Sequence, residues 1–243
     1  MRYVLDVHCH TVNSGHAYST ISENATHAAE IGLTHIGICD HAPGMPGGAH
    51  LNNFRNLWIL PDYIQGVRVL KGVECNIMNT NGKLDVPDAL LKKMDFVIAA
   101  MHRGITPPTN RTTHTKAIIA AMENNPNMHI LGHPGDACFE IDIEAVVATA
   151  AKTRTIIEIN NQSLNPDSYR CQGTEVFTEM LGFCKEYNVS VLASSDAHFC
   201  TLVGSLDRAK AVIEAAGMDE AQVLNTCADR FLSAIANKRA NRY

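Results

Sequence analysis

Short apolar runs, rich in β-branched residues, recur along the chain and are separated by stretches with helical periodicity. Each run is almost continuously apolar, which is typical of strands buried on both faces of a parallel sheet. Strands are predicted for these runs, at residues 3–8, 35–40, 67–74, 95–102, 128–133, 155–160 and 189–195.

The helices predicted between these runs have recognisable ends. Thr20 and Glu23 have the spacing of a capping box, and Gly32 can end the helix that they begin. Asp142 is a candidate N-cap for a helix that extends to about Ala151. Further helices are predicted at 174–187, 207–216 and 219–238, and a long loop with one short helix at 42–63. This alternation predicts parallel βα units, either in a closed barrel or in an open, doubly wound sheet.

Residues that can bind a metal or donate a hydrogen bond follow every one of the predicted strands. They are His8 and His10, Asp40 and His41, Glu74, His102, His133, Glu158 and Asn160, and Asp196 and His198. The carboxyl ends of the strands build the active site of a βα barrel, whereas an open sheet binds its ligands mostly at one switch point. The recurrence therefore favours a barrel with a polynuclear metal centre.

Cysteines flank several of these positions. Because neighbouring residues of a strand point to opposite faces, Cys9, Cys39 and Cys75 are predicted to be small buried hydrophobic residues rather than ligands. The eight cysteines never have C-x-x-C spacing, which excludes zinc ribbons and thioredoxin-type motifs. At the N-terminus a charge at Asp6 interrupts the chain before an apolar secretory region can form, so we expect free thiols and a cytoplasmic protein.

Composition adds one unusual feature, twelve histidines against a single tryptophan. Such an excess points to metal or proton-transfer chemistry. The histidines outside the strand ends follow a simpler pattern: His27, His35 and His129 are predicted to be structural, and His50 is an outside candidate for substrate contact. The net charge of −5 offers no basic field for nucleic acid or an anionic membrane, so neither partner is expected.

The ordered set His8-Cys9-His10-Thr11, His16, Asp40-His41, Glu74, His102, His133-Pro134 and Asp196-Ala197-His198 resembles the PHP (polymerase and histidinol phosphatase) family, in particular its small stand-alone bacterial phosphatases. The resemblance runs from about residue 3 to residue 200. It implies an α/β fold with a single domain over residues 1–243, a distorted, TIM-like (β/α)7 barrel. The metal site would lie at the C-terminal ends of the strands, and C-terminal helices at about 204–239 would pack on the barrel.

The same resemblance implies three divalent metal ions per chain, zinc first, with manganese or iron as alternatives. His8, His10 and Asp196 would hold one ion, and Glu74 would bridge it to a second ion held by His102 and His133. The third ion would be held by His16, His41 and His198. Asp40 would lie beside these ligands or near the substrate.

This donor set has its own chemical logic. Imidazoles and carboxylates without a thiolate suit Zn²⁺, Mn²⁺ or Fe²⁺ better than Mg²⁺ or Ca²⁺. Three such ions against two carboxylates leave a charge of about +4, which attracts an anion. We therefore hypothesise a phosphomonoesterase that hydrolyses a small phosphorylated metabolite through in-line attack by a metal-bridging hydroxide. Arg103 is a candidate clamp for the transition state, since a guanidinium can donate two hydrogen bonds to one phosphate. The simpler alternative is that Arg103 is a solvated charge in a loop.

Other functions stay open. A phosphodiesterase or exonuclease would use Phe54, Arg55 and Trp58 to stack on nucleotides. An amidohydrolase or deaminase also begins with H-x-H, but the ligands of the third ion argue against it. A metal-binding scaffold without activity is a further possibility, because fold does not fix function. A homo-oligomer is expected only by analogy with the small relatives.

Overall fold

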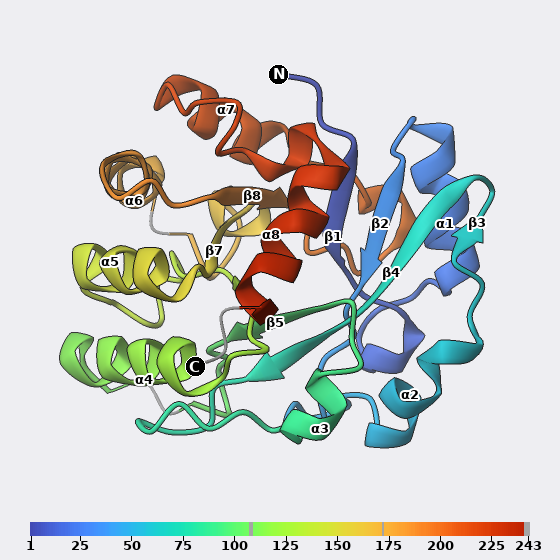
Figure 1. Ribbon diagram of the computed structural model, residues 1–243, viewed down its shortest axis with the longest axis horizontal. Helices are drawn as coiled ribbons and strands as arrows, with labels where there is room; N and C mark the ends of the chain where they lie inside the picture. The colour runs from blue at the N-terminus through green and yellow to red at the C-terminus, as the bar shows by residue number, and fades with distance from the viewer. Residues whose placement is uncertain (107–108, 172, 241–243) are drawn as a thin grey trace.

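Parallel strands form the centre of the protein in the order β1-β2-β4-β5-β6-β7-β8, and a short β3 pairs antiparallel with β4. The structure is a computed structural model that describes residues 1–106, 109–171 and 173–240 (Figure 1). The strand bounds are β1 Leu5–Cys9, β2 His35–Ile38, β3 Tyr63–Ile64, β4 Val67–Asn76, β5 Phe96–Ala100, β6 Ile130–Leu131, β7 Ile156–Asn160 and β8 Val191–Ser194.

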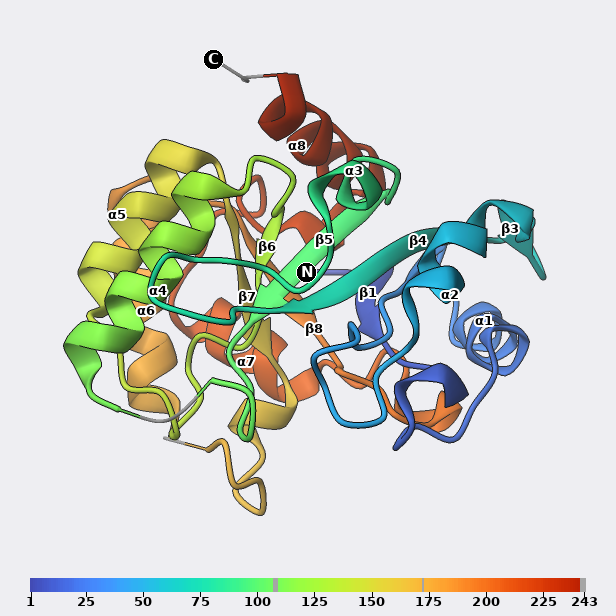
Figure 2. The same cartoon turned by 90° about the horizontal axis from the view of Figure 1, so that it is seen from below.

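Helices surround these strands (Figure 2). Their bounds are α1 Ile21–Glu30, α2 Leu51–Asn56, α3 Asp88–Leu91, α4 Arg111–Asn124, α5 Ile143–Thr153, α6 Thr174–Glu186, α7 Asp207–Ala215 and α8 Ala228–Ala240. The predicted capping box at Thr20 and Glu23 begins α1, and Asp142 caps α5, as expected. The predicted long loop contains one short helix, α2. None of the described helices is both long and apolar enough to cross a membrane.

The barrel closes between β1 and β8 without a regular ladder. Near the carboxyl ends, the amide of His10 donates to the carbonyl of Ala197 at 2.8 Å, and the amide of Ala197 donates to the carbonyl of His8 at 3.2 Å. Near the amino ends, Asn225 lies between the two strands, where its side-chain amide donates to the carbonyls of Leu5 (3.1 Å) and Ala193 (2.8 Å). The predicted α/β fold with a parallel, nearly closed barrel of seven strands is thus confirmed.

The predicted helix over residues 219–238 is wrong in its first half, because α8 begins only at Ala228. Carbonyls of the preceding segment accept backbone hydrogen bonds from β8 and from the residue before β1. The amide of Val191 donates to the carbonyl of Gln222, and the amide of Val4 donates to the carbonyl of Asn225, both at 2.8 Å. Tertiary pairing with β8 and β1 therefore overrides the local helical pattern.

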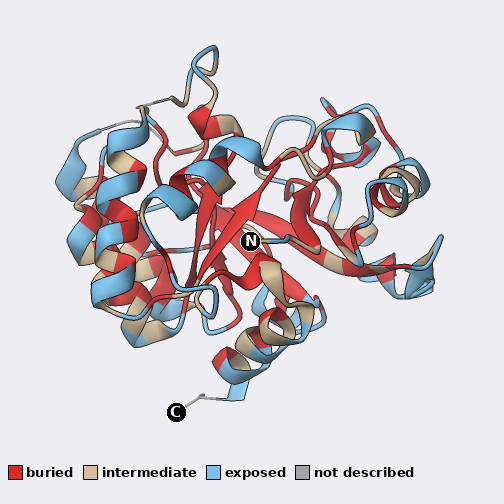
Figure 3. Ribbon diagram, turned by 90° about the horizontal axis from the view of Figure 1, so that it is seen from above, coloured by how far each residue is buried: buried red, intermediate tan, exposed pale blue. Residues whose placement is uncertain are grey.

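Two apolar regions enclose the strands, as the buried centre in Figure 3 shows. Outward-facing strand residues pack against the surrounding helices. Inward-facing residues form a second cluster inside the barrel, which η5 (Leu224–Thr226) and α8 close from the amino ends of the strands. This inner cluster consists of Leu5, Val7, Cys39, Leu70, Phe96, Ile98, Ile130, Ile156, Leu192, Leu224, Phe231 and Ile235.

Candidate metal centre

A β-bulge in β1 directs the first two histidines into the barrel. Asp6 pairs with Ile36 and Cys9 pairs with Ile38, so β1 has one more residue than β2 over this stretch. Val7 belongs to the inner apolar cluster and Cys9 to the outer one. The extra residue lets His8 face inward as well, and bulges beside active sites commonly redirect a side chain in this way.

The structure brings the predicted ligands together at the carboxyl ends of the strands. The imidazoles of His8, His10, His16, His41, His102, His133 and His198 form a continuous cluster with neighbouring ring centroids 4.3–6.3 Å apart. The carboxylates of Glu74 and Asp196 lie among them. Three groups in this cluster have donor atoms close enough together to hold a metal ion: His8-His10-Cys39, His10-His41-His198 and His41-Glu74-His102.

Glu74 lies at the centre of the cluster, and its two oxygens face different histidines. Oε1 lies 3.1 Å from Nε2 of both His102 and His133. Oε2 lies 2.6 Å from Nδ1 of His41 and 3.6 Å from Nε2 of His10. A carboxylate whose oxygens are shared in this manner can bridge two metal ions.

Asp196 is also divided between two environments. Its Oδ1 faces Nε2 of His10 at 3.2 Å and of His8 at 3.6 Å. Its Oδ2 accepts hydrogen bonds from Nη2 of Arg170 at 2.5 Å and from the side-chain Nδ2 of Asn160 at 3.3 Å. The backbone φ of Asp196 is +54°, in the left-handed region that few residues other than glycine adopt, and such strain concentrates at functional sites.

Four histidines use Nδ1 in a hydrogen bond outside the cluster. His8 donates to Glu158 at 2.6 Å, His10 to the hydroxyl of Ser14 at 3.0 Å and His102 to Asn76 at 2.7 Å. His198 donates to the carbonyl of Asp196 at 2.9 Å. A proton fixed on Nδ1 leaves the lone pair of Nε2 for a metal, as in most metal-binding histidines.

Asp40 supports this arrangement from one layer further out. Its carboxylate accepts from the hydroxyls of Ser14 and Thr11 and from the amide of Thr11, each at 2.7 Å. Since the Ser14 hydroxyl donates to Asp40, its lone pairs accept from His10 and from the amide of His41 at 3.1 Å. Asp40 therefore lies beside the cluster and orients it through Ser14.

The buried atoms of the cluster fit a metal centre. Among the described residues, Nε2 of His8 and His10, Nδ1 of His41 and Oε2 of Glu74 are buried without a hydrogen bond of acceptable geometry. Native proteins satisfy nearly all such atoms, because an unsatisfied one costs about 1–3 kcal/mol. These lone pairs converge on shared space, and imidazole with carboxylate is a donor set that divalent transition metals prefer.

The charge states also suit metal binding. Burial disfavours a charged carboxylate, but His102, His41 and His8 more than offset it and hold the pKa of Glu74 well below its usual range. Arg170 and His8 do the same for the pKa of Asp196. Burial lowers the pKa of His10 and His102, whereas the carboxylates of Glu158, Asp196 and Glu74 raise the pKa of His8 despite its burial. Ionised carboxylates and neutral imidazoles are the forms that bind metal.

The sequence prediction missed Arg170, whose guanidinium contacts Asp196. Arg170 follows the exposed Tyr169 in an irregular segment without a readable motif, so only the folded arrangement identifies it. Arg103, the predicted clamp, lies against the same tyrosine: its guanidinium carbon is 4.6 Å from the Tyr169 ring centroid, and that of Arg170 is 6.0 Å from it. Nε of Arg103 also donates to the sulfur of Cys138 at 2.6 Å.

Two further expectations need correction. Cys39 does not point away from the histidines, because it belongs to the inner cluster and its sulfur lies near the donor atoms of His8 and His10. The alternation of β2 itself explains this: Ile36 and Ile38 face outward, so Cys39 faces inward, as does His41 two residues further on. Phe54 is a core residue, which removes one of the proposed nucleotide-stacking side chains. His50 accepts from the amide of Asn52 and caps α2.

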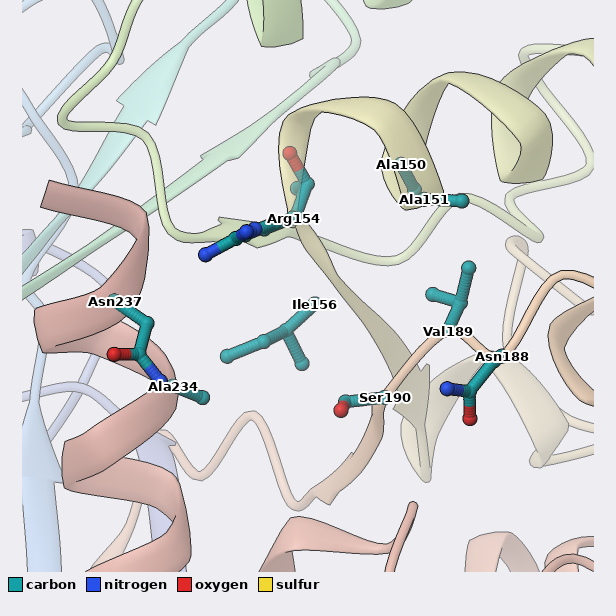
Figure 4. A pocket seen from close by; sticks show the side chains of 10 residues that line it. Ala150, Ala151, Arg154, Ile156, Asn188, Val189, Ser190, Ala234 and Asn237 are labelled. Carbon is teal, nitrogen blue, oxygen red and sulfur yellow. The ribbon is translucent and has the colours of Figure 1, made fainter. Parts of the chain in front are cut away.

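One cavity of the protein lies far from this cluster. It has a volume of about 300 Å³ and lies at the amino ends of β7 and β8, where Ile156 and Ser190 line it beside α8 (Figure 4). The side chain of Arg154 extends across it towards Asn237. Those are the opposite ends of the strands from Asn160 and Ser194, so the cavity and the histidine cluster belong to opposite ends of the barrel.

Fold and cluster together define a βα barrel with a polynuclear metal donor set at the carboxyl ends of its strands. Residues 6–240 match the PHP domain, and the chain belongs to this family. It is 44% identical over 241 residues to a probable phosphatase of Caldanaerobacter subterraneus, covering 98% of this chain and 93% of the relative. It is 38% identical over 238 residues to a probable phosphatase of Clostridium novyi, covering 98% and 96%.

Solved structures agree in fold. One is the crystal structure of a histidinol phosphate phosphatase from Lactococcus lactis complexed with zinc, L-histidinol and phosphate, with a TM-score of 0.65 at 18% identity over 89% of this chain and 95% of that one. Another is an archaeal ribonuclease P with mature tRNA, determined by cryo-electron microscopy, with a TM-score of 0.58 at 14% identity over 97% and 91%. Both likenesses concern the fold alone.

Proposed function

We propose that this phosphoester hydrolase is a metal-dependent phosphomonoesterase that acts on a small phosphorylated substrate. The observation that carries the proposal is the set of buried, unsatisfied donor atoms on His8, His10, His41 and Glu74 at the carboxyl end of the barrel. The relatives named probable phosphatases support the same reaction class.

Three ions would occupy the cluster in this proposal. His8, His10 and Asp196 would hold one ion, and Glu74 would bridge it to a second held by His102 and His133. His16, His41 and His198 would hold the third, and their rings lie 4.6–5.8 Å apart. When bound, such ions polarise a phosphoryl group and activate water for in-line attack. Zinc is the first choice, because the Lactococcus lactis neighbour contains it.

The chain's own residues supply orientation and charge. Arg170 is partly buried, holds Oδ2 of Asp196 and has a buried Nε without a hydrogen-bond partner in the described structure. A guanidinium with a free N–H beside the metal ligands suits a phosphoryl oxygen, so we assign the clamp role to Arg170 rather than to Arg103. Glu158, Ser14 and Asn76 keep the Nε2 atoms of their histidines directed into the cluster.

The proposal is tested by elemental analysis together with hydrolysis of p-nitrophenyl phosphate and its bis-ester. We expect about three metals per chain and turnover of the monoester. Preference for the bis-ester would favour a phosphodiesterase or nuclease, and one metal or none would refute the trinuclear assignment. Binding of three metals without any turnover would leave only a metal-binding scaffold.

Replacing one ligand sharpens the test. His198→Ala is expected to lose one metal per chain and to lower kcat for p-nitrophenyl phosphate by more than about 100-fold, because even an outer partner of a metal ligand costs 10–100-fold. His27→Ala is the matched control, since His27 lies on α1 outside the cluster. Equal metal content in the two variants would contradict the assignment of His198.

A further inference from the structure

Arg103 is a fixed cation at the rim of the candidate metal centre. It directly follows His102, one of the histidines around Glu74. Although the residue is exposed, its guanidinium is held on two sides, by the Tyr169 ring at 4.6 Å and by the Cys138 sulfur, to which Nε donates at 2.6 Å. An exposed arginine ordinarily samples many rotamers, so these contacts reduce the entropy that binding would cost.

The loop that carries these contacts is itself anchored. The amide of Cys138 donates to Asp136 at 2.8 Å, and the amide of Ala137 donates to the carbonyl of Arg170 at 2.9 Å. The loops after β5, β6 and β7 therefore meet around the Tyr169 ring. Arg103 is positioned relative to Arg170 and Asp196 through this shared ring rather than by its own loop alone.

The two arginines at this ring differ in their charge partners. Arg170 forms an ion pair with Asp196 at 2.5 Å. For Arg103, by contrast, no carboxylate lies within ion-pair distance in the described parts of the chain. Among the described residues only its Nε has a hydrogen-bond acceptor, and both terminal nitrogens of the guanidinium are without one there. A preorganised cation without an anion, at the rim of an anion-binding centre, is suited to a second anionic group on the same ligand.

We propose that Arg103, Tyr169 and Cys138 form a second anion subsite, and that the preferred substrates are phosphomonoesters that carry another anionic group, a carboxylate or a second phosphate. This inference rests on the proposed function. The scissile phosphate would occupy the metal centre beside Arg170. The second anion would accept hydrogen bonds from the terminal guanidinium nitrogens of Arg103.

Binding of phosphonates, which are not hydrolysed, tests the subsite without relying on activity. Calorimetric titration of the metal-loaded protein would compare propylphosphonate with 3-phosphonopropanoate and with propane-1,3-bisphosphonate. We expect the two ligands with a second anion to bind at least about tenfold more tightly, since a hydrogen bond to a charged group contributes roughly that much. The two tails distinguish a carboxylate site from a phosphate site.

Variants identify the residue responsible. Arg103→Gln should lose the preference for a second anion, and Arg103→Lys should recover part of it, because the charge remains and the fork is lost. Arg154→Gln is the matched control: Arg154 is another exposed arginine, at the cavity on the opposite end of the barrel (Figure 4), and this variant should keep the native preference.

The outcomes separate the subsite from the proposed function. No preference in the native protein, a preference that Arg103→Gln retains, or an equal loss for all three phosphonates would overturn the subsite. Turnover of p-nitrophenyl phosphate by the native protein decides the proposed function independently. If the protein does not turn over p-nitrophenyl phosphate but still prefers phosphonates with a second anion in an Arg103-dependent way, the proposed function is refuted and the subsite stands.

Discussion

The two ends of the barrel are built from the same strands but solve opposite problems. At the amino ends, apolar side chains of α8 and η5 close the barrel, and Phe231 packs edge-to-face on Phe96 with 6.3 Å between ring centroids. At the carboxyl ends, buried imidazoles and carboxylates meet with unsatisfied donor atoms. One end contributes packing energy, whereas the other holds polar atoms that need a ligand.

This difference arises within single strands. The inward positions of β4 change from Leu70 to Glu74 and Asn76, and those of β7 change from Ile156 to Glu158 and Asn160. Since inward positions recur every second residue, the barrel interior passes from apolar to polar within two such steps. Stability and chemistry are thus separated along the strand axis, and mutations at the two ends should have separable effects.

The largest expected effect on stability is at the amino end. Phe231→Ala removes a fully buried ring and should lower the free energy of unfolding by about 3–5 kcal/mol. Metal content should stay at the native value, because Phe231 packs on inner apolar residues at the amino ends of the strands, whereas the candidate ligands follow the carboxyl ends. Urea unfolding and elemental analysis measure both. Tyr63→Ala on β3, where the ring is 61% exposed, is the control. Loss of metal in Phe231→Ala would show that the two ends are coupled.

A smaller effect of the opposite kind is expected at the carboxyl end. Ser14→Ala removes the acceptor for Nδ1 of His10 and should lower metal affinity about 10–100-fold, the usual cost of losing such a partner. Long-range ¹H–¹⁵N NMR of the metal-free protein should show the Nδ1–H tautomer of His10 in the native chain and a mixture in the variant. Ser22→Ala, at an exposed position of α1, is the control. Native affinity in Ser14→Ala would contradict the orienting role of Asp40 and Ser14.

The barrel could be predicted from the sequence because most of its outward strand positions are apolar. Those positions contact helices, as Val73, Val97 and Ile157 do, so the strands appear as continuous apolar runs. The segment that closes the barrel between β1 and β8 could not be predicted from the sequence. The segment around Asn225 has a helical pattern, and only β1 and β8 on either side reveal that its backbone pairs with strands.

The residues of the candidate site likewise fall into those that the sequence predicts and those that only the folded structure identifies. Its ligands lie next to strand ends, where position along the chain predicts position in space. Arg170 and Ser14 act through contacts made by irregular segments, so no periodicity indicates them. The position of Glu158 at a strand end predicts that it belongs to the site, whereas its role as the partner of His8 follows only from the 2.6 Å contact between them.

A buried lysine departs from the apolar character of the amino end, and it offers the finest test. Lys238 of α8 is buried, and its ammonium donates to the carbonyl of Thr153 at 2.9 Å and to the hydroxyl of Thr155 at 2.6 Å. Burial lowers the pKa of Lys238 to about 7 from its usual 10.5. Below pH 7 the folded and unfolded chains both carry the charge, so the full penalty of burying it is present.

Between pH 7 and 10.5 the unfolded chain holds a proton that the folded chain has released, so this lysine makes the free energy of unfolding rise with pH across that window. In Lys238→Met this contribution of the lysine to the pH dependence of the unfolding free energy is absent. Because it also loses two hydrogen bonds, we expect the variant to be more stable than the native protein by only about 1–2 kcal/mol at pH 6 and no more stable at about pH 10. Urea unfolding at constant metal content measures the difference, with Lys116→Met on the exposed face of α4 as control. If the difference in unfolding free energy between the variant and the native protein does not change with pH, water reaches the ammonium and the amino end is more hydrated than its packing indicates.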